Sequence, residues 1–288
     1  MANDDPFQRI IDRHLSLEQQ QAIRQRTSIK DMTQEEYLRM QADAYNKTHG
    51  NLPDYDCKEC LNKGVIEIVR PYEDIWGNNT FEIASRECKC MKIRREIKRL
   101  KSSGIYRLAK RNTFNAFKSS ERFQREIKKK AQEYVKDFGD SWFYIGGQPG
   151  CGKTHLCTAI VTTLIKGGMN ARYMVWTEDC AILKQFINEK SFENLIKPYY
   201  TVDILYIDDF LKTPQGEGLS KADVNMAFRI INHRYNAGLL TIISSELSLN
   251  HIFTIDEALA GRIAQMTGSD YDLFVEPDPT KDYRRKNK

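Results

Sequence analysis

One stretch of this 288-residue chain decides its fold: Gly147-Gln148-Pro149-Gly150-Cys151-Gly152-Lys153-Thr154-His155. Its first eight residues fit the pattern G-x-x-x-x-G-K-[ST], directly after an apolar strand pattern and at the start of a helical one, which is the context this motif requires. Glycines let the backbone N–H groups surround phosphate oxygens, and the following helix adds its positive N-terminal end. The stretch predicts a phosphate-binding loop, and an incidental glycine-rich turn is the alternative.

We expect all nine of these residues to bind ATP, with Lys153 reaching the β- and γ-phosphates and the Thr154 hydroxyl binding Mg²⁺. The apolar run from Asp203 to Asp209 predicts a buried strand that ends in carboxylates at the same edge of the sheet. Asp208 would hold Mg²⁺ through water, and Asp209 would polarise the attacking water. Ordinary carboxylates at a strand end are the alternative. Most ATPases of this kind use the longer glutamate at position 209, so we expect slow hydrolysis.

From residue 105 onward, strand and helix patterns alternate, which predicts an α/β fold with a parallel sheet flanked by helices. The predicted strands are Trp142–Ile145, Arg172–Val175, Ile204–Ile207, Leu240–Ser244 and Leu273–Val275. Helices are predicted at residues 152–166, 178–189, 220–236 and 256–266.

The composition is typical of a soluble globular protein, with 41% hydrophobic and 29% charged residues. No apolar stretch approaches the ~18 residues that a membrane helix needs. The N-terminus, MANDDPFQRI, lacks the basic start and apolar run of a signal peptide. We therefore expect a cytoplasmic protein with no membrane partner.

Four of the seven cysteines form two close pairs, Cys57-x-x-Cys60 and Cys88-x-Cys90. Between them, short β-type runs at 65–69 and 80–83 flank a Gly-Asn-Asn turn, which predicts a hairpin. Two cysteine pairs supply the four soft ligands of a structural zinc site. Free thiols or a redox pair are the alternatives, and His49 is a weaker substitute ligand. We expect the other three cysteines, Cys151, Cys157 and Cys180, to be packing residues.

Apolar residues recur at helical spacing over residues 7–46, which predicts two or three short amphipathic helices before the turn formers at 48–54. A basic helix is predicted at Met91–Leu100. The chain then divides into an N-terminal helical segment (1–54), a four-cysteine module with a basic linker helix (55–104) and an ATPase domain (105–288).

The segment from Arg86 to Lys130 contains seventeen Lys or Arg residues, four Glu and no Asp. Such a charge excess suits the backbone of single-stranded DNA, with Phe114, Phe117 and Phe123 as stacking rings. A solvated charged face, with the three phenylalanines in the core, is the alternative.

Together, the cysteine module, the phosphate loop and the Asp282-Tyr283-Arg284 sequence resemble the bacterial replicative helicase loaders of the DnaC/DnaI type, within the AAA+ ATPases, and their IstB-type transposition relatives. The resemblance extends over essentially the whole chain. It implies that the segment before Pro53 grips the hexameric replicative helicase, and the alternative is that this segment packs on the ATPase domain. By the same resemblance, ATP binding drives self-association into an oligomer.

The resemblance also implies roles for individual residues. Ser244 or Ser245, of which we favour Ser245, corresponds to the sensor I position near the γ-phosphate, although Glu246 replaces the asparagine that commonly follows. Arg262 resembles the arginine finger that one subunit offers to its neighbour's ATP, and Arg284 resembles the sensor II arginine. Both arginines would otherwise be solvated charges. Arg234 is a second candidate for the finger, and an ordinary surface arginine is the stronger interpretation there.

The implied function is ATP-dependent loading of a replicative helicase onto single-stranded DNA. An IstB-type transposition ATPase would share every ATPase residue. A zinc-bearing interaction adaptor, with ATP as a structural ligand, is a rival of another class.

Overall fold

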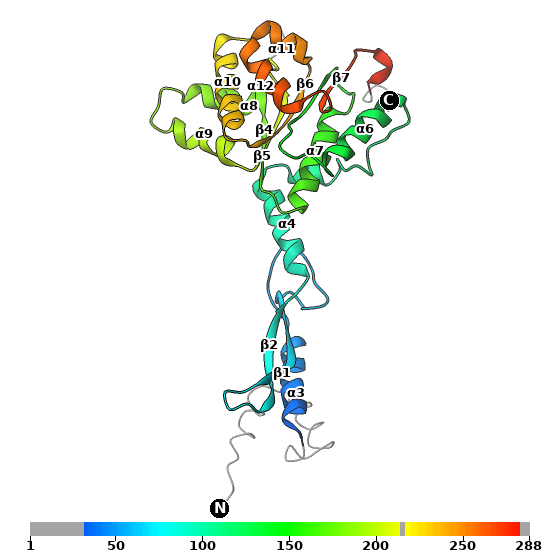
Figure 1. The fold of residues 1–288 in the computed structure, drawn as a ribbon, viewed down its shortest axis with the longest axis vertical. Coiled ribbons are helices and arrows are strands. Elements are labelled where there is room, and N and C mark those ends of the chain that lie inside the picture. Colours follow the sequence, from blue (N-terminus) through cyan, green and yellow to red (C-terminus); the bar gives the residue numbers. More distant parts are fainter. Residues whose placement is uncertain (1–31, 214–216, 283–288) are drawn as a thin grey trace, which may run out of the picture. The chain divides into compact units, whose positions relative to one another are not determined.

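The computed structural model describes residues 32–213 and 217–282, which fall into two compact units, Met1–Arg95 and Glu96–Lys288 (Figure 1). Helix α4 (Cys90–Ser102) spans the boundary and confirms the basic helix predicted at 91–100. Of the amphipathic helices predicted over 7–46, α3 (Gln34–Asn46) is confirmed, and the part up to residue 31 lies outside the described residues. The three-part domain division stays a prediction.

The first unit contains the predicted hairpin, formed by β1 (Val65–Glu73) and β2 (Asn79–Glu87). The strands are antiparallel and longer than predicted, with Val65 opposite Glu87 and Glu73 opposite Asn79. Helix α3 is joined to β1 by the Asn46 side chain, which donates to the Glu67 carbonyl (2.8 Å) and accepts from the Glu67 N–H (2.9 Å). The hairpin is therefore braced along its length by a helix.

The second unit is built on a five-stranded parallel sheet in the order β4-β5-β6-β3-β7. Its strands are β3 (Phe143–Gly147), β4 (Ala171–Val175), β5 (Ile204–Phe210), β6 (Leu240–Ser245) and β7 (Asp272–Val275). They confirm the five predicted strands, with ends that differ by up to three residues. The loops at the carboxyl ends of β3, β5 and β6 meet at one edge.

Helices cover both faces of this sheet, as predicted for α/β proteins (Figure 1). They are α5 (Tyr106–Ala109), α6 (Arg122–Tyr134), α7 (Lys153–Lys166), α8 (Trp176–Gln185), α9 (Phe192–Thr201), α10 (Lys221–Asn236), α11 (Leu249–Ile255) and α12 (Glu257–Thr267), and a short 3₁₀ helix, η2 (Pro279–Lys281), follows β7.

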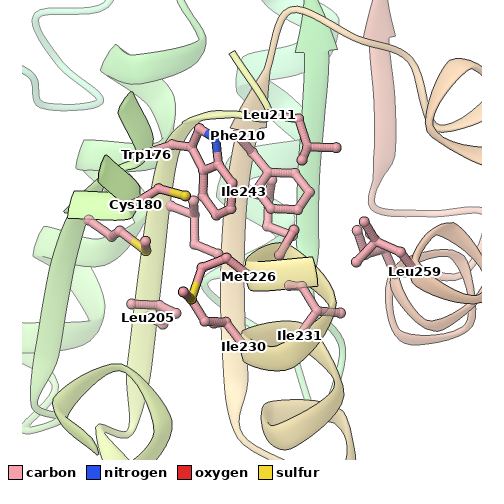
Figure 2. Packing of buried hydrophobic residues seen from close by; sticks show 14 of the residues in the cluster. Trp176, Cys180, Leu205, Phe210, Leu211, Met226, Ile230, Ile231, Ile243 and Leu259 are labelled. Atoms are coloured by element: carbon pink, nitrogen blue, oxygen red, sulfur yellow. The ribbon is translucent and has the colours of Figure 1, made fainter. Parts of the chain in front are cut away.

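The core forms two hydrophobic clusters, one on each face of the sheet, because side chains alternate along each strand. Leu205 and Ile207 of β5 belong to the cluster under α8 to α12, where Figure 2 shows Trp176, Phe210 and Ile230 packed together. The neighbouring positions of β5 belong to the cluster under α5, α6 and α7. Burial on both faces explains why the strands read as continuous apolar runs.

The predicted helices at 152–166, 178–189, 220–236 and 256–266 correspond to α7, α8, α10 and α12. Helix α9 was not predicted, because Pro198 lies within it and proline usually ends a helix. Helix α6 was seen only as part of the basic segment. Its charges are exposed, whereas Ile127, Ala131 and Tyr134 are buried at helical spacing.

The three phenylalanines of the basic segment lie in the core, which is the alternative considered for them. Phe117 is buried in the cluster on the α7 face, and Phe114 and Phe123 pack against that cluster. Free stacking rings for DNA bases at these positions are therefore wrong. The three remaining cysteines are buried, as predicted.

Arg234 is completely buried, which contradicts both its predicted surface position and the finger role considered for it. Its guanidinium donates to the carbonyls of Tyr199 (3.0 Å), Val202 (3.0 Å) and Leu240 (2.5 Å), and to the Thr241 hydroxyl (3.0 Å). Burial lowers the pKa of Arg234 to about 9. This side chain ties α10 to the end of α9 and the start of β6.

We expect Arg234→Ala to lower the free energy of unfolding by about 3 kcal/mol, because the buried carbonyls lose their donor. Urea denaturation measures the change. Arg229→Ala is the matched control: Arg229 is exposed on the same helix, and its loss should cost at most about 0.5 kcal/mol. Equal effects of the two substitutions would contradict the role of Arg234.

Candidate nucleotide-binding site and metal centre

The loop between β3 and α7 has the backbone conformation that its glycines predict. Gly147, Gly150 and Gly152 have φ angles of 139°, 82° and 103°, in the region that side chains disfavour. A Cβ atom at Gly147 would overlap the backbone of Val275, and one at Gly152 would overlap the ring of Phe117. The loop can adopt this curl only with glycine at these positions.

Lys153 is buried, and its amine folds back on the loop that precedes it. The Nζ atom donates to the carbonyls of Gly147 (2.7 Å) and Gln148 (2.9 Å). Lys153 begins α7, so its charge lies at the helix end where anions are favoured. A phosphate group that enters the loop would meet both the ammonium and the free N–H groups of the helix.

The loop opens into a cavity of about 220 Å³. Six of the nine predicted loop residues line it together with three residues from β5, β6 and their loops: Pro149, Gly150, Gly152, Lys153, Thr154, His155, Asp209, Lys212 and Glu246. Gly147 ends β3, and Cys151 is buried. The Gln148 amide instead makes a reciprocal pair with the backbone of Asp278, at 2.6 and 2.8 Å.

His155 is half-buried at the wall of this cavity. Its Nε2 lies 2.8 Å from the Thr113 carbonyl, and its ring meets that of Phe117 edge-on, with the centroids 5.2 Å apart. Burial lowers the pKa of His155, so its ring is neutral near pH 7. His155 therefore joins α7 to the segment before α6 without adding a charge to the cavity.

Asp208 is buried at the end of β5, where four hydroxyl groups donate to its carboxylate. They belong to Thr154 (3.0 Å), Tyr173 (2.8 Å), Tyr206 (2.8 Å) and Ser244. The structure therefore brings Thr154 and Asp208 together, as the prediction of a shared Mg²⁺ requires. Hydroxyl and carboxylate oxygens are the hard donors that Mg²⁺ prefers, so these residues fit the ion.

The two tyrosines of this group were missed by the sequence analysis. Burial, together with the charge of Asp208, raises the pKa of Tyr206 well above its ordinary value, so its hydroxyl keeps the proton that it donates. Tyr206 could have been found, because residues two apart on a strand face the same side. Tyr173 lies on β4, and no local pattern points to it.

Asp209 lines the cavity next to Asp208. The pairing of β5 with β6 shifts register between Ile207 and Phe210, and Asp209 has a φ of 55°, which aspartate tolerates better than most residues. Its carboxylate forms an ion pair with Lys212, 3.0 Å away. The irregular strand end therefore turns Asp209 toward the cavity while Asp208 stays buried.

The two serines of β6 have different surroundings. The Ser244 hydroxyl donates to Asp208. The Ser245 hydroxyl donates to the Phe210 carbonyl (2.8 Å) and accepts from the Leu247 N–H (3.1 Å). Both serines are buried, and neither lines the cavity. The sensor role favoured for Ser245 stays a prediction.

Arg262 lies on α12 and does not line the cavity of its own chain. Its guanidinium donates to Asn232 (2.9 Å) and to the Ala258 carbonyl (2.8 Å), and it lies 4.9 Å from the centre of the Phe228 ring. Its finger role stays a prediction. Arg284, the predicted sensor II residue, lies outside the described residues.

The four paired cysteines meet in the first unit. Their sulfur atoms all lie within 4.8 Å of one another, with Cys57 3.7 Å from Cys88 and Cys60 3.5 Å from Cys90. Tetrahedral zinc with bonds of about 2.3 Å separates its sulfur ligands by about 3.8 Å. The buried thiols therefore fit zinc, and His49 is not part of the cluster.

Neighbouring groups support these thiols. Burial opposes ionisation of Cys60, yet the Gly64 N–H (3.2 Å) and the adjacent thiols lower its pKa to about 6. Arg94 donates to the carbonyls of Leu52 (2.8 Å) and Tyr55 (2.6 Å), which holds the chain leading to the first cysteine pair. Such outer contacts orient metal ligands.

We expect the purified chain to contain about one zinc ion per molecule and Cys60→Ser to lose most of it, because three thiolates bind less tightly than four. Elemental analysis after gel filtration measures the metal. Cys180→Ser, at a buried cysteine outside the cluster, should keep the zinc. Full zinc content in Cys60→Ser would contradict the assignment.

In the described part of the chain, no helix combines the length and apolar character needed to cross a bilayer. YqaM of Bacillus subtilis (strain 168) is 32% identical to this chain over 204 residues, which cover 67% of this chain and 64% of YqaM. The replicative helicase loader DnaC of Buchnera aphidicola subsp. Schizaphis graminum (strain Sg) is 32% identical over 138 residues, or 46% of this chain and 55% of that protein. This chain thus spans less than two thirds of the length of either relative.

A crystal structure of the DnaC helicase loader has a TM-score of 0.45 and 22% identity, and the match covers 58% of this chain and 96% of that one. The sequence pattern of one family, described as IstB-like ATP binding protein, matches residues 82–265. The predicted resemblance to DnaC/DnaI- and IstB-type AAA+ ATPases is thereby confirmed. Because the match extends over more than half of the chain and includes the phosphate loop and both aspartates, this chain belongs to the IstB-like ATP-binding protein family.

Proposed function

We propose that this protein is an ATP-dependent loader that binds a hexameric replicative helicase and places it on single-stranded DNA. Its family of replication and transposition ATPases binds ATP. The observation that carries the proposal is the contact between Thr154 and Asp208 (3.0 Å) beside the buried Lys153. The name of the DnaC relatives supports helicase loading as the use of that site.

In this proposal Lys153 and the loop N–H groups bind the terminal phosphates of ATP. Thr154 and Asp208 hold Mg²⁺, which neutralises charge on those phosphates when bound. Asp209 orients the attacking water. Its side chain is one methylene shorter than glutamate, and it is engaged by Lys212 (3.0 Å), so we infer slow hydrolysis. ATP then acts mainly as a switch between two binding states.

Self-association follows from the position of Arg262. Its guanidinium is half-buried on α12, away from the cavity of its own chain, and is steadied by Asn232 and Phe228. A charge held in this way suits the phosphates of a neighbouring subunit. Arg284 would act within its own subunit. ATP would then lie between subunits and favour the oligomer.

We propose that the first unit contacts the helicase. At the turn of the hairpin, Ile75 is 87% and Trp76 79% exposed. The turn is ordered, because the Asp74 carboxylate accepts from the N–H groups of Trp76 (2.9 Å) and Asn78 (2.8 Å). A rigid turn that presents two large apolar side chains suits a protein partner, where aromatic anchors contribute most.

Contact with DNA would depend on phosphates rather than on stacked bases, because the phenylalanines of the basic segment are in the core. Arg122, Arg125 and Lys129 remain exposed on α6. Such charges give binding that is independent of sequence and weakens with salt.

We expect Lys153→Ala to weaken ATP binding at least about hundredfold, because the phosphates lose their buried cation. Titration calorimetry with ATP and Mg²⁺ measures the dissociation constant. Lys166→Ala removes an exposed lysine at the other end of α7 and should bind as the unaltered protein does. Unchanged ATP binding in Lys153→Ala would refute the site.

We expect the protein to capture a replicative helicase in a pull-down, more strongly with ATP than without. Deletion of residues 1–50 and the substitution Trp76→Ser should each reduce capture several-fold, since truncating an aromatic anchor commonly costs at least ~1 kcal/mol. Phe253→Ser changes a part-exposed aromatic residue of the second unit and serves as the control.

The rivals give different pull-down results. An IstB-type transposition ATPase binds ATP but captures no replicative helicase. A zinc-bearing adaptor captures its partner equally with and without ATP, because the nucleotide is then only a structural ligand. Either result would replace helicase loading as the function.

A further inference from the structure

The phosphate cavity contains a second lysine that neither the motif nor the family resemblance assigns. Besides Lys153, the charged residues of the cavity lining are Lys212, Asp209 and Glu246. The Lys212 amine lies 3.0 Å from the Asp209 carboxylate and 2.8 Å from that of Glu246. Lys212 therefore bridges the two acids that face the cavity.

The backbone explains why these three side chains meet. Asp209 and Leu211 both have left-handed φ angles, of 55° and 59°, and the Lys212 N–H donates to the Asp209 carbonyl (3.0 Å). The chain thus turns back on itself directly after β5. Glu246 follows β6, the neighbouring strand. The bridge links the ends of these two strands across the cavity wall.

The charges of the cavity define what Lys212 does there. Both acids line the cavity beside Lys153 and Thr154, which are expected to bind the terminal phosphates and Mg²⁺. Two uncompensated carboxylates would repel a phosphate group at close range, even with the screening of a part-exposed site. Burial favours loss of the Lys212 proton, but Glu246 and Asp209 outweigh it and raise the pKa of Lys212 above its usual value. The lysine is therefore charged near neutral pH.

We propose that Lys212 is a positioning residue for the γ-phosphate: it neutralises and orients Asp209 and Glu246, and so allows the cavity to accept the terminal phosphate of ATP. The proposal rests on the ATP site described above. It gives Glu246, where the family commonly has asparagine, a partner in the same chain. It also sets the orientation of Asp209, the residue expected to polarise water.

The test compares ATP with ADP, which lacks the γ-phosphate. In titration calorimetry with Mg²⁺, Lys212→Met should weaken ATP binding about tenfold and change ADP binding less than about twofold. Glu246→Gln in the same chain removes one of the exposed acids, so the double variant Lys212→Met/Glu246→Gln should recover most of the ATP affinity. Glu246→Gln alone should bind ATP more tightly than the unaltered protein.

Lys197→Met, at an exposed lysine of α9, controls for the loss of a positive charge elsewhere on the same unit. Thermal unfolding checks that each variant folds, and Glu246→Gln alone tests the charge argument if Lys212→Met does not. Equal losses for ATP and ADP, or no recovery in the double variant, would overturn the role of Lys212. If Lys153→Ala abolishes ATP binding while Lys212→Met leaves it unchanged, this inference fails and the nucleotide site stands.

Discussion

The second unit depends on one buried carboxylate, Asp208 at the end of β5. A carboxylate removed from water costs several kcal/mol unless its oxygens accept hydrogen bonds. Here the donors come from α7, β4, β5 itself and β6. Each donor is in place only if the strands β4, β5 and β6 are adjacent and parallel, with α7 packed over the end of the sheet. The fold and the expected Mg²⁺ site therefore share one polar network.

Much of this network could be predicted, because local patterns specify it. The glycine spacing of the phosphate loop, the apolar run that ends in Asp208 and the alternation of strands and helices are all visible over short stretches. Lys212 and Glu246 could not be placed, because the register shift after Ile207 and the two left-handed residues that follow have no sequence signature as strong as a glycine motif. The two β6 serines are similar: their assignment depends on which one the irregular end of β5 leaves opposite Asp208.

Charged and aromatic residues were the hardest to assign, since their burial depends on tertiary contacts. Arg234 lies next to His233 at the end of a helix, which is typical of a surface charge, yet it serves carbonyls from three segments. The phenylalanines at 114, 117 and 123 are interspersed with exposed cations, but they complete the core on the α7 face. Mixed composition predicts an interface only when the apolar residues have no core of their own to join.

The phosphate loop is shaped by packing as well as by the chemistry of phosphate. Gly147 is confined by Val275 and Gly152 by Phe117, and a Cβ atom at Gly150 would overlap the Asp282 carboxylate. Each contact comes from outside the loop, and the Gln148 amide adds the reciprocal pair with Asp278. A loop held from several sides has little freedom to lose when a ligand binds, which favours affinity. The glycines therefore serve two constraints together: they expose N–H groups to phosphate, and they let β7, η2 and the segment before α6 approach closely enough to fix the loop.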